Sequence, residues 1–558
     1  MDNSVAVDWR LWITMRDGVR LAARLYRSRN GSAAPAIVTM TPYAVDRYHV
    51  DAMFFARAGY VFVAVDCRGR GDSEGRFAPS FIDFEDGHDT VEWIARQAFC
   101  DGQVAMWGGS YAGENQWNTL VTRPPHLRTV VPAAATHTPA DYPWRGPVRS
   151  RYALQWLLSV GGRESSPSHL VSDDRLWRSA FGAHHLAGAA YADLPSYLGG
   201  TSPHFDEYLS HPTHDPYWRK LAFSDADYAR IDIPILTIAG QYDEAQRGSL
   251  HYVREHERLG SAAAVATHFV VIGPWDHDGT RSGARQCGGV DFGPEAEVDL
   301  RDLTLRWYDW ILRGGARPSM LKDRVTYYET GRSCWQGASG LAELSETSLA
   351  LFLAGGPSPG GPERLEMAND HPGGHLEWRS DPSDIRPAAM EAEQSQDWLR
   401  DFGPYPQLFG GGFAFESAPL ASGLSVAGWP SLSLWVGTDL PDADLQATLS
   451  EVGPDGTLLK LSEDMVRLRY RQGTDAELAC TADQPMRLTF AGFTFVARRI
   501  APGARLRLTI CTVNSIHLQR NFQAGGNVDL ESLAQARVGT IRILHGAAHP
   551  GVLSLPLR

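Results

Sequence analysis

The chain has 558 residues, of which 43% are hydrophobic, and a formal net charge of −13. Because a single hydrophobic core rarely grows beyond about 250 to 300 residues, this length predicts two or three domains. The charge is spread along the chain without a run of Lys or Arg, and no segment approaches the roughly 20 apolar residues of a membrane span. We therefore expect a cytoplasmic protein with neither a nucleic acid nor a membrane as its partner. The six cysteines are scattered without a Cys-x-x-Cys pair or a Cys/His cluster, which predicts free thiols and no metal site.

The N-terminal half alternates short apolar strands with glycine or proline turns and helical stretches. Alternation of this kind predicts an α/β fold, in which a doubly wound, mostly parallel sheet is covered by helices on both faces. The clearest predicted strands are Ala36–Met40, Val61–Asp66, Val104–Trp107, Ile235–Ala239 and Phe269–Ile272.

The pattern changes twice further along the chain. Beyond residue 136 the strands stop and the sequence becomes rich in Trp, Tyr and His with helical periodicity, which predicts a helical cap inserted into the α/β domain. After an amphipathic helix at 299–312, segments of period two such as 432–436 and 505–510 predict an all-β sandwich or jelly roll. The predicted regions are an α/β domain at 1–135 and 222–318, a helical insertion at 136–221 and a β domain at 319–558.

A nucleophile candidate stands in the segment Val104-Ala-Met-Trp-Gly-Gly-Ser110-Tyr-Ala-Gly113, where a strand runs through a glycine-flanked serine into a helical stretch. This context is typical of a nucleophile elbow, a sharp strand-to-helix turn that exposes a serine and tolerates only small neighbours. A Gly-x-Ser sequence is also common in ordinary turns. A triad built on an elbow requires an acid and then a histidine further along the chain.

Both partners are found directly after predicted strands. Asp243 and His277 would lie at the carboxyl edge of the sheet, where ligand sites of open α/β sheets gather. A helix-capping aspartate or a core histidine would explain either residue alone, but three residues in the right order and context predict the triad Ser110, Asp243 and His277. Rival residues fit this order less well, namely His88, His211, His214, His268, Asp276 and Asp278.

Longer segments form a more specific set: Met15-Arg-Asp-Gly-Val-Arg-Leu21, Asp66-Cys-Arg-Gly-Arg-Gly-Asp-Ser-Glu-Gly75, Gly108-Gly-Ser-Tyr-Ala-Gly113 and Gly273-Pro-Trp-Asp-His277. They resemble the first strand pair, the Asp-x-Arg-Gly-x-Gly-x-Ser-x-Gly signature, the elbow and the Gly-Pro-Trp-x-His motif of the cocaine esterase and X-prolyl dipeptidyl-peptidase family of α/β-hydrolases. The resemblance runs nearly end to end. It implies a hydrolase domain with a helical cap and a C-terminal jelly-roll (galactose-binding-like) domain, one of whose turns is similar to Asp439-Leu-Pro-Asp-Ala-Asp444.

The resemblance also implies an oxyanion hole. Family members use a tyrosine hydroxyl and a backbone amide, which match Tyr43 and the amide of Tyr111. Without the resemblance, Tyr43 would be interpreted as a buried tyrosine beside a proline turn. The implied enzyme is a serine hydrolase that cleaves a carboxylic ester or amide through an acyl-enzyme on Ser110, with His277 as general acid and base and Asp243 orienting it. This chemistry requires no metal and no organic cofactor.

The substrate pocket is expected under the helical insertion, where aromatic residues are frequent. Aromatic residues at helical spacing lie in cores more often than in pockets, so this assignment competes with a structural one. The candidates to line the pocket are Tyr142, Trp144, Tyr152, Trp156, Trp177 and Trp275.

One departure from the family's sequence pattern narrows the class of substrates that we expect. Its α-amino ester hydrolases hold the substrate ammonium with carboxylates two and three places after the triad acid, where this chain has Ala245 and Gln246. Since an unpaired ammonium in an apolar pocket is costly, we expect a small-molecule ester or amide with an uncharged acyl group. Asp141, Asp173 and Asp278 remain as alternative ammonium partners. Acyl transfer, a dipeptidyl or aminoacyl peptidase activity and, more remotely, a non-catalytic binding role stay open, as does homo-oligomer formation.

Overall fold

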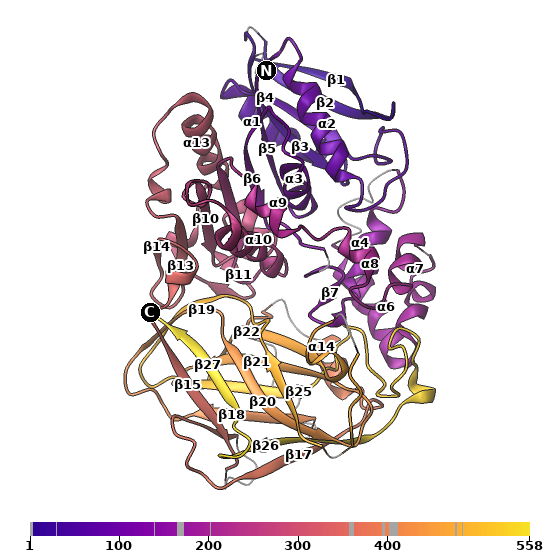
Figure 1. Cartoon of the computed structure of the whole chain (residues 1–558), viewed down its shortest axis with the longest axis vertical. Coiled ribbons are helices and arrows are strands. Elements are labelled where there is room, and N and C mark those ends of the chain that lie inside the picture. The colour runs from indigo at the N-terminus through magenta and orange to yellow at the C-terminus, as the bar shows by residue number, and fades with distance from the viewer. Residues whose placement is uncertain are drawn as a thin grey trace.

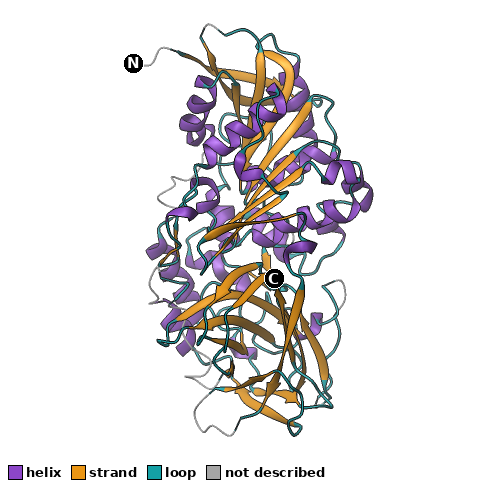
Figure 2. Ribbon diagram, turned by 90° about the vertical axis from the view of Figure 1, so that its left-hand side faces the viewer, coloured by secondary structure: helices purple, strands orange, loops and turns teal. Residues whose placement is uncertain are grey.

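The computed structural model describes residues 4–29, 31–138, 140–163, 172–200, 202–356, 362–392, 397–400, 411–474, 477–482 and 484–558. An α/β region that includes the N-terminus lies at the top of Figure 1, a β domain lies at the bottom, and the helices of the insertion lie to one side. Figure 2, turned by 90°, shows the strands of the upper sheet between helices and the lower region built almost entirely of strands.

The first sheet has ten strands in the order β1-β2-β4-β3-β5-β6-β9-β10-β13-β14. In this order the strands from β4 to β13 run parallel, whereas β1, β2 and β14 pair antiparallel with their neighbours. The predicted mostly parallel α/β fold is therefore confirmed. The strands are β1 (Val5–Thr14), β2 (Arg20–Ser28), β3 (Ala34–Thr41), β4 (Val61–Asp66), β5 (Cys100–Gly109), β6 (Leu127–Ala133), β9 (Ile235–Gly240), β10 (His268–Gly273), β13 (Val325–Glu329) and β14 (Cys334–Ala338).

Helices cover both faces of this sheet, because successive side chains of a strand point to opposite faces. In β4, Val63 and Val65 enter the hydrophobic core that includes residues of α2 and α3. Phe62 and Ala64 enter a second core, on the face covered by α1 and α13. The covering helices are α1 (His49–Arg57), α2 (Asp83–Ala95), α3 (Tyr111–Val121), α10 (Gln246–Leu259) and α13 (Leu300–Arg313).

The first sheet extends beyond residue 318, where the sequence pattern predicts the start of the β domain. β13 pairs parallel with β10, and β14 pairs antiparallel with β13. All five residues of β13 are buried. A short strand of this kind carries no mark in its sequence that tells which of two neighbouring sheets it joins, so the pattern could not place it.

The insertion between β6 and β9 is mainly helical but includes a short hairpin that the sequence pattern did not predict. Its strands β7 (Trp144–Arg145) and β8 (Val148–Arg149) pair antiparallel, and Gly146 in the turn has a φ of 61°. Two residues per strand are too few to display a period of two. The helices of the insertion are α4 (Tyr152–Ser159), α6 (Asp174–Leu186), α7 (Pro203–Leu209), α8 (Pro216–Arg219) and α9 (Asp225–Ala229).

The β domain is a separate, largely antiparallel sheet assembly of 13 strands, in agreement with the prediction. The strands predicted at 432–436 and 505–510 lie within β20 and β25, and alternate residues of β20 enter the domain core. Its strands are β15 (Thr347–Ala354), β16 (Glu363–Glu366), β17 (Gly374–Ser380), β18 (Gly412–Ser417), β19 (Leu424–Gly428), β20 (Ser431–Thr438), β21 (Asp444–Val452), β22 (Leu458–Arg467), β23 (Met486–Phe490), β24 (Val496–Ile500), β25 (Arg505–Thr512), β26 (Gly539–His545) and β27 (Val552–Leu557). It also holds helix α14 (Arg386–Ala392).

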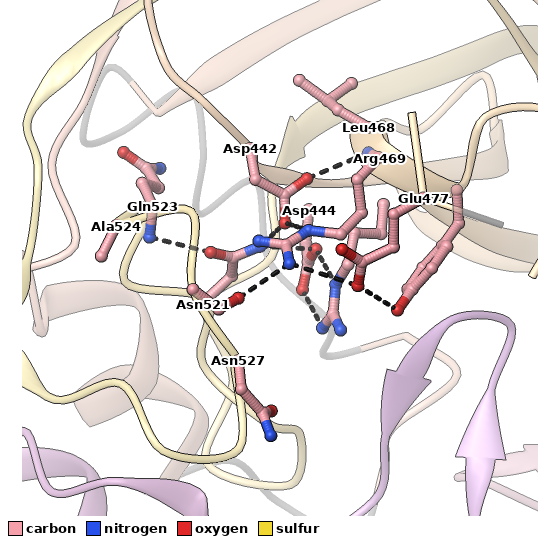
Figure 3. A network of polar contacts seen from close by, with 12 residues as sticks. Asp442, Asp444, Leu468, Arg469, Glu477, Asn521, Gln523, Ala524 and Asn527 are labelled. Atoms are coloured by element: carbon pink, nitrogen blue, oxygen red, sulfur yellow. Dashed lines mark hydrogen bonds and ion pairs between the residues drawn. The ribbon is translucent and has the colours of Figure 1, made fainter. Parts of the chain in front are cut away.

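A buried polar network joins the loops of the β domain. Asp442 accepts hydrogen bonds from Arg469 Nε at 2.7 Å and from Asn521 Nδ2 at 2.9 Å (Figure 3). A few residues further along the chain, Asp529 forms an ion pair of 3.0 Å with Arg149 of β8, and both side chains are buried. Breaking a buried ion pair leaves an uncompensated charge, so this pair holds the insertion firmly against the β domain.

None of the described helices combines the length and the apolar character needed to cross a bilayer.

Candidate active site

Ser110 lies at the sharp turn from β5 into α3. Its φ of 63° and ψ of −127° are a strained conformation for a residue with a side chain, and this strain presents the serine at the carboxyl end of the strand. Small neighbours make the turn feasible. A Cβ at Gly113, in the first turn of α3, would lie only 2.9 Å from the carbonyl oxygen of Ala133 in β6. The geometry is that of a nucleophile elbow.

Asp243 and His277 meet at the same edge of the sheet. They follow β9 and β10, which are parallel neighbours, and the last residues of these strands, Gly240 and Gly273, lie opposite each other. Asp243 Oδ1 is 2.8 Å from His277 Nδ1 and also accepts the backbone N–H of Ala245 at 2.9 Å. The topology of the sheet therefore brings the two predicted partners into hydrogen-bond contact.

The environment of His277 favours its protonated form. Burial is the largest single influence and lowers the pKa of the imidazole, but the charge and hydrogen bond of Asp243 together outweigh it and raise the pKa above 6.5. Arg281 acts to lower this pKa and Glu244 to raise it. The ring is partly exposed, whereas the Asp243 side chain is fully buried. An imidazole held in this way can accept a proton from one side while its Nδ1 remains fixed on the other.

Tyr43 follows β3 and lies beside the serine. Its hydroxyl accepts a hydrogen bond from Trp156 Nε1 at 2.9 Å. Burial raises the pKa of this hydroxyl, and hydrogen bonding to the side chains of Trp156 and Ser110 partly offsets the increase. Within the described residues, no hydrogen bond joins Ser110 to His277. Such contacts are often long in free enzymes and shorten when substrate binds.

Tyr111, the residue after Ser110, occupies the first turn of α3, where backbone N–H groups have no partner within the helix. Its side chain packs in the core. The phenol oxygen accepts the N–H of Ser80 at 2.8 Å, and the ring stacks on Trp156 with 5.7 Å between centroids. Tyr142 packs edge-on against the other side of Trp156 at 5.2 Å. Trp156 therefore links the elbow, Tyr43 and the insertion.

A cavity of about 730 Å³ opens beside His277, between the three regions. The loops after β9 and β10 contribute residues 241–244 and 276–278, and the β domain contributes residues 460–465 of β22. Of the aromatic candidates in the insertion, Trp144 and Tyr152 line this cavity. The cavity is large enough for a small organic substrate, whose pockets typically measure about 300–1,000 Å³.

The other aromatic candidates are placed differently and do not line the cavity. Trp177 packs against Phe181 within the insertion. Trp275 is fully buried behind the sheet, and its Nε1 donates to the carbonyl oxygen of Ala296 at 3.2 Å. Trp156 donates to Tyr43. The role of Trp156 as a donor to Tyr43 was missed from the sequence, because tryptophan at helical spacing looks the same whether its N–H meets a core carbonyl or a catalytic hydroxyl.

The residue three places after Asp243 has a structural role. Gln246 donates from Nε2 to the carbonyl oxygen of Gln241 at 2.8 Å, and its Oε1 accepts the N–H of Phe495 at 2.6 Å. The side chain therefore joins the α/β region to the β domain. It is occupied by these contacts and carries no charge, so it offers no ammonium partner.

The remaining carboxylates differ in their surroundings. Asp141 lines the cavity, and its oxygens accept the backbone N–H groups of His137 and Gly248, each at 2.8 Å. Burial raises the pKa of Asp141 well above its usual value. Asp173 caps α6, and Asp278 is exposed and paired with Arg281. Within the described part of the chain, the group of acidic and histidine side chains spaced to hold a metal ion lies in the β domain, away from these residues.

Sequence comparisons identify the family. The profile of the X-Pro dipeptidyl-peptidase (S15 family) matches residues 17–279, and that of the X-Pro dipeptidyl-peptidase C-terminal non-catalytic domain matches residues 406–554. The chain is 27% identical over 605 residues to the cocaine esterase of Rhodococcus sp. (strain MB1 Bresler), and the match covers 100% of this chain and 99% of that protein.

Two solved structures share the fold across the whole length. An α-amino acid ester hydrolase superposes with a TM-score of 0.86 at 22% identity, covering 100% of this chain and 97% of that one. An aminopeptidase from a marine sediment archaeon, Thaumarchaeota archaeon, superposes with a TM-score of 0.85 at 23% identity, covering 99% and 96%. The chain therefore belongs to the X-Pro dipeptidyl-peptidase S15/CocE family and is a serine hydrolase that acts on esters or amides.

Proposed function

We propose that this enzyme hydrolyses a carboxylic ester, or an amide with an uncharged acyl group, through an acyl-enzyme formed on Ser110. The observation that carries the proposal is the contact between His277 Nδ1 and Asp243 Oδ1, 2.8 Å long, at the edge of the sheet where the strained turn holds Ser110. The aspartate fixes the tautomer in which Nε2 is free to accept a proton.

The first half of the reaction acylates the serine. His277 Nε2 accepts the proton of Ser110 Oγ as this oxygen attacks the substrate carbonyl, and the carbonyl π electrons move to the oxygen. Collapse of the tetrahedral intermediate breaks the bond to the leaving group, which takes its proton from His277. Asp243 stabilises the imidazolium that exists between these two proton transfers. In the second half, His277 accepts a proton from a water molecule as the water oxygen attacks the acyl-enzyme carbonyl. Collapse of the second tetrahedral intermediate breaks the bond to Ser110 Oγ, which regains its proton from His277, and the carboxylic acid is released.

Two donors stabilise the negative charge on the carbonyl oxygen. The Tyr43 hydroxyl is already beside Ser110, and the Tyr111 amide lies at the N-terminus of α3, where the helix dipole also favours negative charge. Fixed donors of this kind stabilise the transition state more than the bound substrate, because the negative charge develops only as the serine attacks. The loss of one donor typically costs about 2.7 to 4 kcal/mol.

Contacts beside the triad acid support an uncharged acyl group. Ala245 has no carboxylate, and both polar ends of Gln246 are occupied by backbone groups. Similarity to the cocaine esterase supports an ester as the scissile group. The structural likeness to an aminopeptidase extends to the fold and carries no argument for peptide substrates.

A panel of p-nitrophenyl esters of graded acyl length tests the proposal, run beside an amino-acyl anilide and a Ser110→Ala variant. We expect the wild type to hydrolyse the esters and to be labelled by a fluorophosphonate, and the variant to lose activity by roughly 10⁴-fold or more. Ester hydrolysis that survives in the variant would contradict Ser110 as nucleophile. Release of the anilide without ester hydrolysis would instead favour an aminopeptidase, and acyl transfer to an added alcohol in place of hydrolysis would favour a transferase.

A further inference from the structure

A second cluster of chemically active side chains lies far from the serine, in the loop between β16 and β17. Glu366, Asp370 and His371 each offer one ligand atom, and these atoms lie within 4.8 Å of one another. The loop ends where Gly374 pairs with His545, the last residue of β26. In Figure 1, β17 and β26 run side by side at the bottom of the β domain, at the opposite end of the molecule from the N-terminus.

The imidazole of His371 is the unusual member of this group. Its side chain is only 5% exposed, yet neither ring nitrogen has a hydrogen-bond partner among the described residues. The nearest carboxylate oxygen, Glu366 Oε2, is 3.8 Å from Nδ1, which is too long for a hydrogen bond. Buried polar groups without partners are rare in folded proteins, and an unrecorded ion is one of their standard explanations. A cation between Nδ1 and Oε2 would pair with both atoms.

A second histidine lies next to the first. The ring of His545 is 5.7 Å from that of His371 between centroids, and its Nδ1 is also buried without a partner among the described residues. On the other side, Arg364 pairs with Glu366 Oε1 and leaves Oε2 directed at His371.

We propose that Glu366, Asp370 and His371 form a zinc site, with His545 or a water molecule as the fourth ligand. Imidazole nitrogen together with carboxylate oxygen is a ligand set that suits Zn²⁺, whereas Mg²⁺ and Ca²⁺ prefer oxygen alone. Metal–ligand bonds of about 2.0 to 2.2 Å place neighbouring ligand atoms of a tetrahedral site about 3.4 Å apart. The ligand atoms lie within 4.8 Å of one another, so the side chains would have to rotate toward one another to reach this arrangement. The ion would fasten the β16–β17 loop to the end of β26 and stabilise the β domain.

Titration of the full chain with zinc tests the proposal. Protein stripped of metal with a chelator is titrated with ZnCl₂ by calorimetry, and Tm is measured across the same concentrations. We expect one tight zinc site per chain and a Tm that rises with the logarithm of the zinc concentration. His371→Ala and Asp370→Asn should each weaken binding by about tenfold or more and remove the rise in Tm. His375→Ala, which changes an exposed histidine on β17, should leave both results unchanged.

The results that would support the zinc site differ from those that would overturn it. Asp370 is exposed, so its variant reports on binding even if His371→Ala fails to fold. Absence of zinc binding by the wild type would overturn the proposal, as would a zinc affinity that is the same in the wild type and in Asp370→Asn. A rise in Tm produced equally by MgCl₂ or CaCl₂ at the same concentrations would overturn the choice of zinc.

Discussion

The site residues that follow strands of the sheet and those on the helical insertion differ in what determines their positions. Ser110, Asp243, His277 and Tyr43 directly follow β5, β9, β10 and β3, and parallel strands bring their carboxyl ends to one edge. The aromatic residues of the insertion have no common edge. Trp144 and Tyr152 line the cavity, Trp156 contacts Tyr43, and Trp177 packs inside the insertion. Topology fixes the first group, whereas only the docking of helices fixes the second.

The largest expected effect on activity is that of a change at Asp243, one of the site residues that follow strands of the sheet. Asp243→Asn keeps the shape of the side chain but removes the negative charge that stabilises the imidazolium, and an amide nitrogen in the place of Oδ1 would donate to His277 Nδ1 and stabilise the wrong tautomer. We expect kcat for ester hydrolysis to fall by roughly 10³ to 10⁴-fold with little change in KM.

The matched control is Asp278→Asn, in an exposed residue next to the same histidine. It should retain kcat within about twofold, because exposed ion pairs contribute little. If both variants lost activity equally, the position of an acid after β9 would have no special role, and the assignment of Asp243 would be wrong.

Tyr43→Phe should have the second largest effect. It removes the hydroxyl beside Ser110 and keeps the ring, so kcat should fall by roughly 10² to 10³-fold while KM changes little. Tyr48→Phe is the control, because Tyr48 is a tyrosine close to Tyr43 whose ring packs against Trp107. A fall confined to KM would indicate that Tyr43 binds the ground state and not the oxyanion.

The dependence of kcat/KM on pH sharpens the assignment of His277. The base must be neutral, and the pKa of its imidazole is raised by Asp243. Activity should therefore increase with pH through a group titrating above 6.5, fall about tenfold per pH unit below it, and level off above it.

Two neighbouring charges should move this titration in opposite directions. Glu244→Gln removes an influence that raises the pKa of His277, so the rise in activity should shift to lower pH. Arg281→Gln removes an influence that lowers it, so the rise should shift to higher pH. Rates measured from pH 5 to 8.5 in the three proteins provide the check, and shifts in the same direction would argue that another group controls the profile.

Much of the fold was predictable because strands of the parallel sheet carry local signals. Each is a short apolar run that ends in glycine or a turn, and the motif residues follow it directly. Elements without such a local signal could not be predicted. β13 has the sequence Val-Thr-Tyr-Tyr-Glu, which does not tell it from a strand of the β domain, and its membership of the first sheet depends on pairing with β10. The hairpin of β7 and β8 is too short to have a pattern at all.

The candidate site divides in the same way. The sequence pointed to Asp243 and His277 through their order, and the structure brings them into contact. The sequence did not indicate that Gln246 would accept a hydrogen bond from the Phe495 N–H, or that Trp275 would lie behind the sheet. Both depend on contacts with distant segments. Side chains whose role depends on such contacts look alike in sequence.

The smallest expected effect concerns Trp156, the residue at which the two groups meet. Its N–H donates to the Tyr43 oxygen, which leaves the phenol proton to be offered to the substrate and polarises that O–H bond. Trp156→Phe removes this donor and keeps an aromatic ring against Tyr111. Since a hydrogen bond of this type contributes about 0.5 to 1.5 kcal/mol, we expect kcat to fall roughly two- to tenfold.

A double-mutant cycle separates this positioning role from simple packing. Once Tyr43→Phe has removed the hydroxyl, Trp156→Phe should have almost no further effect on kcat, so the two changes should be strongly non-additive. Trp177→Phe, on the same insertion but packed against Phe181, should leave kcat unchanged. If the effects of Trp156→Phe and Tyr43→Phe were additive, the tryptophan would act through the shape of the insertion alone. The catalytic machinery would then be confined to the strand ends, where the sequence predicts it.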